Sequence, residues 1–152
     1  MKAFVIHGKE SCSFIETDAP QVVHDDDVLV QVKAVGICGT DLHIYEGAHP
    51  MCQGVDRVPG HEFAGVVTAV GKSVKKLKVG DRVVHEPISY CGHCYACRHE
   101  QGNVCRDVHV TGCNMDGGCQ ELFCAAEKQW HKIPDWMTWE QAALVEPYTI
   151  AA

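Results

Sequence analysis

Ten cysteines and ten histidines give this sequence most of its capacity for chemistry, and four of the cysteines are closely spaced. These four, Cys91, Cys94, Cys97 and Cys105, follow the pattern C-x2-C-x2-C-x7-C. Zinc accepts four thiolates in a tetrahedron, and two-residue gaps allow consecutive cysteines to turn toward one ion. Because four thiolates leave no position for water or substrate, the spacing predicts a structural zinc site.

The stretch that carries these cysteines, residues 87–110, shows no strand periodicity over its 24 residues. A loop of that length needs support in a compact domain, and a bound metal would supply it. Two alternatives stay open at this point: four unligated thiols, or an iron–sulfur cluster, whose typical pattern continues with x3-C-P. A zinc ribbon that binds nucleic acid is disfavoured, because Glu86, Glu100 and Asp107 lie among the basic residues of this stretch.

Four further residues of metal-ligand type are dispersed along the chain. Cys38 lies between a predicted strand and a short helical turn, His61-Glu62 follows Pro59-Gly60, and Glu146 precedes a proline. Each has a simple structural explanation. A lone cysteine is usually a small core residue, and the other three would fit an exposed strand start and a charge near a helix terminus. Their spacing alone does not connect them.

The composition is that of an ordinary globular protein, with 46% hydrophobic and 22% charged residues among 152. One domain is the default prediction. The net charge of −7 predicts no nucleic-acid partner, because binding to phosphates needs a clustered positive surface. The apolar run at residues 3–6 is shorter than the roughly 7 to 15 residues of a signal peptide, and no run approaches the roughly 18 residues of a membrane span. We therefore expect a cytoplasmic protein without membrane contact, whose thiols stay reduced.

Short apolar runs divided by Gly, Pro and Asp predict a mainly β fold with a barrel-like core and short helices. Val28, Val30 and Val32 alternate with other residues, as is typical of a strand. The predicted strands cover residues 3–7, 13–16, 28–35, 63–70, 82–85 and 121–125.

A helix is predicted from residue 135 onward. Thr138 can cap it, Gln141 completes the capping-box spacing, and Pro147 is expected to interrupt it. The tryptophans of this region are expected either to cover the barrel or to face a further domain; they are Trp130, Trp136 and Trp139. The cysteines outside the two candidate sites are expected to be buried thiols; they are Cys12, Cys52, Cys113, Cys119 and Cys124.

Read together, several segments resemble the amino-terminal catalytic domain of the zinc-dependent medium-chain dehydrogenases, the alcohol and polyol dehydrogenase superfamily. They are Gly36-Ile37-Cys38-Gly39-Thr40-Asp41, Pro59-Gly60-His61-Glu62-Phe63-Ala64-Gly65 and Val79-Gly80-Asp81-Arg82-Val83, followed by the four cysteines and Gly117-Gly118. The resemblance spans essentially the whole chain and implies a GroES-like barrel. Glu86-Pro87 and Glu146-Pro147 look most like the sorbitol-type branch, and residues 38–45 also look like threonine and butanediol dehydrogenases.

The resemblance assigns a second, catalytic zinc to Cys38, His61 and Glu62, which leaves a fourth coordination position open. Glu146 then ligates directly, through water, or by exchange with Glu62. A metal with an open position acts as a Lewis acid and lowers the pKa of an alcohol.

The resemblance also implies a route for the alcohol proton. Thr40 would accept the hydrogen bond of the alcohol, and His43, three residues later on the same helical face, would carry the proton to solvent. Without the resemblance, Thr40 as the cap of a turn and His43 as a surface residue would be the simpler interpretation.

The implied function is oxidation of a secondary alcohol in a polyol, a sugar acid or a hydroxy-amino acid such as threonine, with hydride transfer to NAD or NADP. No Gly-x-Gly-x-x-Gly motif between a strand and a helix occurs in the sequence, so the Rossmann domain that would bind the cofactor is absent from it. We therefore expect residues 1–152 to be the catalytic domain, with two zinc ions, of a longer homo-oligomeric enzyme, and to be inactive alone. The alternatives are a non-catalytic zinc-binding interaction module and a quinone oxidoreductase of the same superfamily, whose members lack these zinc ligands.

Overall fold

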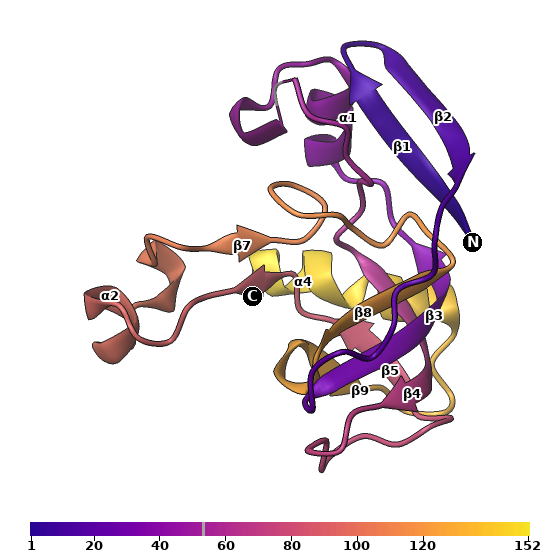
Figure 1. Ribbon diagram of the computed structural model, residues 1–152, viewed down its shortest axis with the longest axis vertical. Helices are drawn as coiled ribbons and strands as arrows, with labels where there is room; N and C mark the ends of the chain where they lie inside the picture. Colours follow the sequence, from indigo (N-terminus) through magenta and orange to yellow (C-terminus); the bar gives the residue numbers. More distant parts are fainter. Residues whose placement is uncertain (53) are drawn as a thin grey trace.

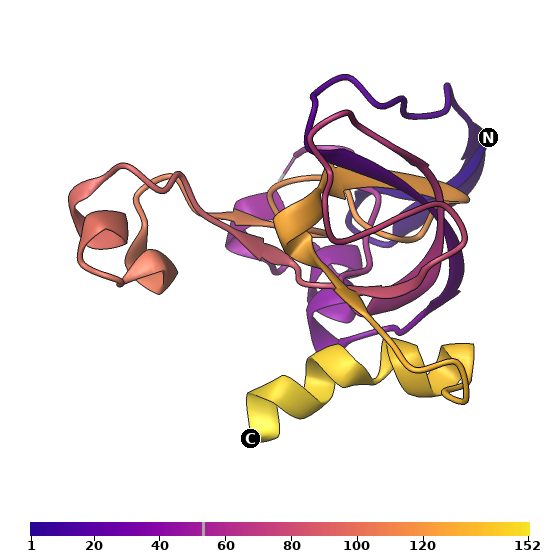
Figure 2. The same cartoon turned by 90° about the horizontal axis from the view of Figure 1, so that it is seen from below.

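The computed structural model describes residues 1–52 and 54–152, and its centre is a five-stranded sheet in the order β8-β3-β4-β5-β9 (Figure 1). All four strand pairs of this sheet are antiparallel. Its strands are β3 (Asp27–Val35), β4 (Phe63–Val70), β5 (Arg82–His85), β8 (Leu122–Ala126) and β9 (Trp130–Lys132). The 3-10 turn η3 (Glu127–Gln129) alone joins the two edge strands, so the sheet curls round toward its own edge (Figure 2). The mainly β, barrel-like fold expected from the sequence is confirmed.

The core lies inside this curl, where alternate residues of the strands point inward. Val28 and Val30 of β3 are fully buried, as their alternation predicts. Burial of each such side chain contributes about 1.5–3 kcal/mol. The full cluster consists of Val28, Val30, Phe63, Val67, Leu77, Val83, Phe123, Ala125 and Trp130.

The three tryptophans have different surroundings. Trp130 belongs to the core, and Trp139 packs under the guanidinium of Arg82, 4.1 Å from its ring centroid. Trp136 is exposed. Of the two expected roles, covering the barrel fits Trp139, which packs against the cluster of Ala64, Val84 and Ala142, whereas Trp130 lies inside the core.

The amino-terminal hairpin, β1 (Lys2–Gly8) and β2 (Ser11–Glu16), forms a separate two-stranded sheet. Every residue of β2 is exposed, because this strand has no partner beyond β1 and no layer packed on it. Cys12 is therefore exposed, and the expectation of a buried thiol there is wrong. Of the other four cysteines in that group, Cys52 and Cys113 are buried, whereas Cys119 and Cys124 are partly buried.

The strands predicted at residues 63–70 and 82–85 have the bounds expected, and the other four shift by one or two residues. Three short strands were not predicted: β6 (Ile88–Ser89), β7 (His109–Val110) and β9. Elements of two or three residues show no hydrophobic period, and only pairing with a distant strand defines them.

The cysteine lobe, residues 87–110, projects from the barrel (Figures 1 and 2). Strands β6 and β7 pair at its base and form a narrow neck, with Ile88 opposite Val110. Beyond the neck the lobe holds only the short helix α2 (Tyr95–Arg98) and the 3-10 turn η2 (Gly102–Val104).

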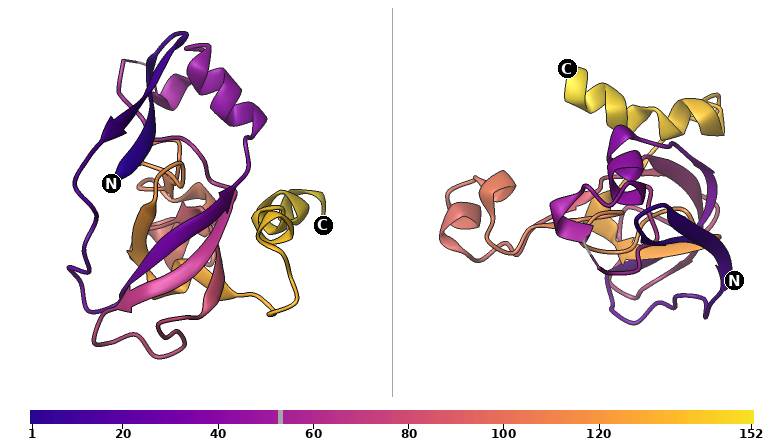
Figure 3. Two further views of the ribbon diagram at one scale, coloured as in Figure 1. Left: turned by 90° about the vertical axis from the view of Figure 1, so that its right-hand side faces the viewer. Right: turned by 90° about the horizontal axis from the view of Figure 1, so that it is seen from above.

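The chain ends in two short helices, α3 (Trp139–Ala143) and α4 (Val145–Ala151), which lie along one side of the sheet (Figure 3). Thr138 and Gln141 form the predicted capping box, but they place the helix start at residue 139 and not at 135. The break falls at Leu144, where α3 ends and α4 begins, and not at Pro147. Pro147 lies in the first turn of α4, where a missing N–H removes no hydrogen bond.

Within the described residues, no helix has the length and apolar character needed to cross a bilayer. All paired strands in this part of the chain are antiparallel, so the parallel sheet of a Rossmann domain is not among them.

Candidate metal centres

The four thiols of the cysteine lobe converge on one point. The sulfur atoms of Cys91 and Cys97 are 3.9 Å apart, and those of Cys94 and Cys97 are 3.5 Å apart. Cys105 lies 3.8 Å from Cys94 and 3.6 Å from Cys91, measured between sulfurs. A tetrahedron with Zn–S distances of about 2.3 Å has sulfurs about 3.8 Å apart. The four side chains therefore fit one tetrahedral ion.

Backbone N–H groups point at these sulfurs. The Cys94 N–H donates to Cys91 Sγ over 3.3 Å, and the Asp107 N–H donates to Cys105 Sγ over 3.3 Å. The N–H of Cys97 and the neighbouring thiols lower the pKa of Cys94 to about 6, whereas burial raises the pKa of Cys97 to about 12. Hydrogen bonds of this kind favour the thiolate, the form that binds metal.

A second group consists of Cys38, His61 and Glu62, whose ligand atoms all lie within 4.8 Å of one another. Pairing of β3 with β4 explains the meeting, because Val35 is opposite Phe63 at the ends of the two strands. The chain just after β3 therefore runs beside the chain just before β4, and the Gly36 N–H donates to the Glu62 carbonyl over 2.7 Å.

Asp41 ties these two chain segments together. It lies in α1 (Gly39–Tyr45) and is 4% exposed. One carboxylate oxygen accepts from the Cys38 N–H over 2.8 Å, and the other accepts from the Gly60 N–H over 3.0 Å. A single buried carboxylate thus fixes the backbone beside two of the three candidate ligands.

The chemistry of this second group fits zinc. One thiolate, one imidazole and one carboxylate form a three-ligand set that leaves a coordination position open. His61 and Glu62 are buried, and Nδ1 of His61 has no hydrogen-bond partner. Gly36 makes room for the carboxylate, because a Cβ at that position would collide with Glu62 Oε2.

A cavity of about 250 Å³ borders this group. Glu146 of α4 reaches it but is not within 4.8 Å of all three candidate ligands. Burial raises the pKa of Glu146, the charge of His61 lowers it, and the nearby carboxylate of Glu62 raises it further. The complete lining is Thr40, His49, His61, Pro87, Ile88, Val110, Cys113 and Glu146.

Thr40 and His43 lie at different distances from this cavity. Thr40 lines it, and its hydroxyl oxygen is 3.8 Å from the sulfur of Cys38. His43 lies one turn later on α1 and is exposed. Among the described residues, no direct hydrogen bond joins the two side chains.

Residues 24–135 match the family model of the alcohol dehydrogenase GroES-like domain. The chain belongs to this family. It is 41% identical over 152 residues to the starvation-sensing protein RspB of Escherichia coli K12 and 39% identical over 153 residues to the sorbitol dehydrogenase of Bacillus subtilis. These alignments cover 100% and 99% of the chain but only 44% and 43% of the two relatives.

Solved structures show the same GroES-like domain. The crystal structure of the alcohol dehydrogenase RspB from Escherichia coli CFT073 with NADH superposes with a TM-score of 0.89 at 42% identity. The match covers 99% of this chain and 43% of that one. The chain therefore spans less than half of the relatives it matches, and one domain of them accounts for all of it.

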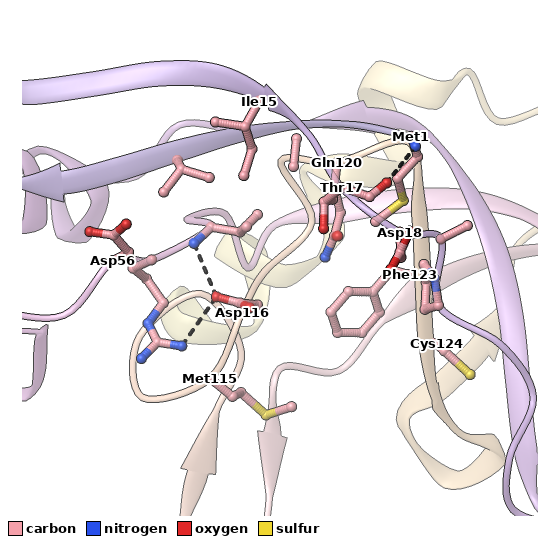
Figure 4. A pocket seen from close by; sticks show the side chains of 16 residues that line it. Met1, Ile15, Thr17, Asp18, Asp56, Met115, Asp116, Gln120, Phe123 and Cys124 are labelled. Atoms are coloured by element: carbon pink, nitrogen blue, oxygen red, sulfur yellow. Dashed lines mark hydrogen bonds and ion pairs between the residues drawn. The ribbon is translucent and has the colours of Figure 1, made fainter.

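The GroES-like domain has a further, larger cavity of about 580 Å³, between the hairpin and the loop that carries Asp116 (Figure 4). Asp116 accepts there from the Val58 N–H and from Arg57 over 3.1 and 3.2 Å. The lining contains none of the residues of the two metal-ligand groups. The smaller cavity, and not the larger, is therefore the candidate active site of this GroES-like domain.

Sequence reasoning missed three residues around the site. Asp41 had a signal, because its three-residue spacing from Cys38 is that of a capping box. His49 and Cys113 line the cavity without any spacing that connects them to the candidate ligands. The loops that carry these two residues reach the cavity only through tertiary packing.

Proposed function

We propose that this GroES-like domain is the catalytic domain of a zinc-dependent dehydrogenase, with one structural zinc in the cysteine lobe and one catalytic zinc at Cys38, His61 and Glu62. The whole enzyme would oxidise a secondary alcohol and transfer the hydride to NAD or NADP, held by a further domain. The observation that carries the proposal is the convergence of three different ligand types beside a cavity. A structural site would instead close all four positions with protein ligands.

Zinc at the three-ligand site would supply Lewis-acid chemistry that makes an alcohol easier to deprotonate and to oxidise. The residues of this chain would do the rest. Thr40 would accept the hydrogen bond of the substrate hydroxyl, because it lines the cavity and its own hydroxyl is 3.8 Å from the sulfur of the candidate ligand Cys38. His43, exposed at the other end of the same helical face, exchanges the proton with solvent. The alcohol would lose one proton to solvent with the help of these two residues, a nicotinamide held by the further domain would take up one hydride, and the product would be a carbonyl compound.

Glu146 would serve as the exchangeable partner of this site. It lines the cavity with His61, and burial and the Glu62 carboxylate hold its pKa above the ordinary value. A carboxylate that lines the cavity can supply the oxygen ligand that an open zinc position accepts. We propose that Glu146 binds the zinc directly, through water, or in exchange with Glu62.

The relatives support a polyol or related secondary alcohol as substrate. One of them is a sorbitol dehydrogenase, and another is an L-threonine 3-dehydrogenase that is 34% identical over 145 residues. A small cavity beside polar side chains suits such a molecule. We further propose that the whole protein is cytoplasmic and forms homo-oligomers.

Zinc content per chain tests the proposal, measured by elemental analysis on the wild type and on Cys38→Ser. We expect about two zinc ions in the wild type and about one in the variant, with an unchanged far-UV circular dichroism spectrum. Cys12→Ser is the matched control, because that thiol is exposed and far from both groups in the fold. It should retain both ions.

A second readout examines the open coordination position. In the cobalt-substituted chain, the visible absorption of the Cys38 site should change on addition of sorbitol or L-threonine, and the change should be absent in Cys38→Ser. One zinc ion in both the wild type and Cys38→Ser would leave only the lobe as a metal site. The interaction-module hypothesis would then replace the enzyme hypothesis.

A further inference from the structure

His85 and Thr111 form a hydrogen bond that closes the neck of the cysteine lobe. His85 is the last residue of β5, just before the lobe begins, and Thr111 directly follows β7, where the lobe ends. His85 Nε2 and Thr111 Oγ1 are 3.0 Å apart, and the two residues are 2% and 0% exposed. Strands of two residues each are a weak tether for a lobe of this size. The buried hydrogen bond between His85 and Thr111, here called the clasp, joins the two chain segments where the neck leaves the barrel.

Aromatic rings of the core fix the histidine side of this clasp. The ring of His85 stacks on Phe63 with centroids 4.6 Å apart, and it contacts Trp130 and Phe123 at 4.8 and 5.0 Å. Phe63 opens β4 directly after His61-Glu62. The orientation of His85 is thus set by the same packing that positions two candidate zinc ligands.

Stability alone does not explain a histidine at this position. Nδ1 of His85 is buried and has no hydrogen-bond partner among the residues that the structure describes, so one of the two ring nitrogens is unpaired there. The less costly neutral tautomer places the proton on Nε2, which donates to Thr111 Oγ1 and leaves only a bare lone pair at Nδ1. An apolar ring would fill the same aromatic cage without this penalty at Nδ1, provided that the buried Thr111 hydroxyl were also replaced by an apolar group.

The threonine side of the clasp leads into the wall of the candidate active site. Val110 and Cys113, on either side of Thr111-Gly112, line the cavity together with His61. Gly112 touches the backbone beside His61, because a Cβ on it would lie 2.9 Å from the Gly60 carbonyl carbon. The position of Thr111 therefore sets the position of this wall.

The other strand of the neck contributes to the same wall. Pro87 and Ile88 also line the cavity. The Thr111 N–H donates to the Pro87 carbonyl over 3.0 Å. Thr111 therefore connects the two chain segments at the base of the neck, one just before β6 and the other just after β7.

We propose that His85 is a positioning residue that acts through Thr111 to hold the neck of the cysteine lobe as one wall of the active-site cavity. This inference rests on the proposed function for the role of the cavity, but the clasp itself is a property of the fold. Under this proposal, loss of the hydrogen bond increases the local mobility of residues 109–113 and leaves the packing of the barrel core unchanged.

The test compares His85→Phe and Thr111→Val with Thr111→Ser, which retains the hydroxyl. Amide hydrogen exchange at residues 109–113 should accelerate at least tenfold in the first two variants and stay at the wild-type rate in Thr111→Ser. The melting temperature of the double variant His85→Phe/Thr111→Val, which leaves neither partner unpaired, should be equal to or above that of the wild type, since a purely structural role for this pair predicts a lower one. Two single variants keep the test informative if one of them does not fold.

The same variants report on the cavity. In the cobalt-substituted chain, His85→Phe and Thr111→Val should weaken the spectral response to sorbitol at least threefold, and Thr111→Ser should not. Unchanged exchange at residues 109–113 in both variants would overturn the proposal, and so would faster exchange that only parallels a lower melting temperature. If the wild type shows no Cys38-dependent cobalt signal, the proposed function fails, while the exchange data still decide whether the clasp exists.

Discussion

The cysteine lobe and the Cys38 site differ in how the chain brings their candidate metal ligands together. In the lobe, four thiols within 15 consecutive residues meet outside the barrel, with sulfurs 3.5–3.9 Å apart and little buried structure around them. At the second site, three different donors come from two segments of the chain that meet only because β3 pairs with β4. One site is local in sequence, and the other is made by the fold.

This difference indicates a different dependence on metal. The lobe has no core of its own, so under the proposed function ion binding would supply most of its folding free energy. The Cys38 site is framed by buried strands and by the buried carboxylate of Asp41, so its geometry exists before an ion arrives. A preformed site can leave a coordination position open, whereas a site that folds its own surroundings needs every ligand.

Loss of one lobe thiol should have the largest effect of the changes considered, because it should unfold the lobe and leave the Cys38 site intact. Cys94→Ser should remove the lobe zinc and leave residues 90–108 unfolded, because binding free energies of structural zinc are about 10–16 kcal/mol at neutral pH. Limited proteolysis followed by mass spectrometry should locate new cleavages only in that range. Cobalt binding at the Cys38 site should persist, and Cys12→Ser should reproduce the wild-type pattern. Cleavage throughout the barrel would show that the two regions fold as one unit.

Asp41→Asn should weaken metal binding at the Cys38 site by about 10- to 100-fold, the usual cost of losing a group that supports metal ligands. An amide oxygen can accept from one backbone N–H, but its NH₂ group then faces the other N–H. Competition with a chelator measures the affinity of this site, and the lobe should keep its wild-type affinity. Asp116→Asn is the matched control, because Asp116 also accepts from a backbone N–H near this segment but lies outside the site. Equal losses in both variants would contradict a specific role of Asp41.

Gly36→Ala should weaken the same site by about tenfold, since its methyl group would displace the Glu62 carboxylate. Gly39→Ala is the matched control, because a Cβ at Gly39 meets no atom within 4 Å. Chelator competition again gives the affinity, and thermal melting verifies that both variants fold. An unchanged affinity in Gly36→Ala would remove Glu62 from the set of ligands.

The last prediction concerns the pH dependence of the free energy of unfolding, to which His85 at the neck contributes. Burial, assisted by the charge of His131, lowers the pKa of His85 to about 3, well below its ordinary value of about 6.5. The unfolded chain therefore binds one proton more than the folded chain between these values, and stability falls as the pH drops below about 6.5. The slope approaches about 1.4 kcal/mol per pH unit.

Urea unfolding at several pH values between 7 and 5 measures this slope. His85→Phe should flatten the pH dependence by that amount, whereas His24→Gln, which removes an exposed ring, should not. We expect the wild type and His85→Phe both to lose bound metal over this pH range, so the difference between their two slopes reports on His85. A wild-type slope in His85→Phe would show that the buried ring does not control acid stability.

The sequence predicted the mainly β fold, the strands at residues 63–70 and 82–85, and the capping box of α3, because each leaves a local pattern. It did not predict the neck strands, since two-residue elements have no period. The exposure of Cys12 was also beyond it, because exposure depends on whether another layer covers the strand.

The sequence alone predicted that the four lobe cysteines meet, because their arrangement follows from turns of a few residues. For Cys38, His61 and Glu62, family resemblance suggested the grouping, but only the register of β3 against β4 brings the three side chains within 4.8 Å. The tertiary structure alone decided the cavity wall, the tie through Asp41 and the clasp of His85 on Thr111. The hydrogen bonds of Asp41 to Gly60 and of His85 to Thr111 join residues 19 and 26 positions apart, and no local rule of chain geometry determines which distant residues a fold will place together.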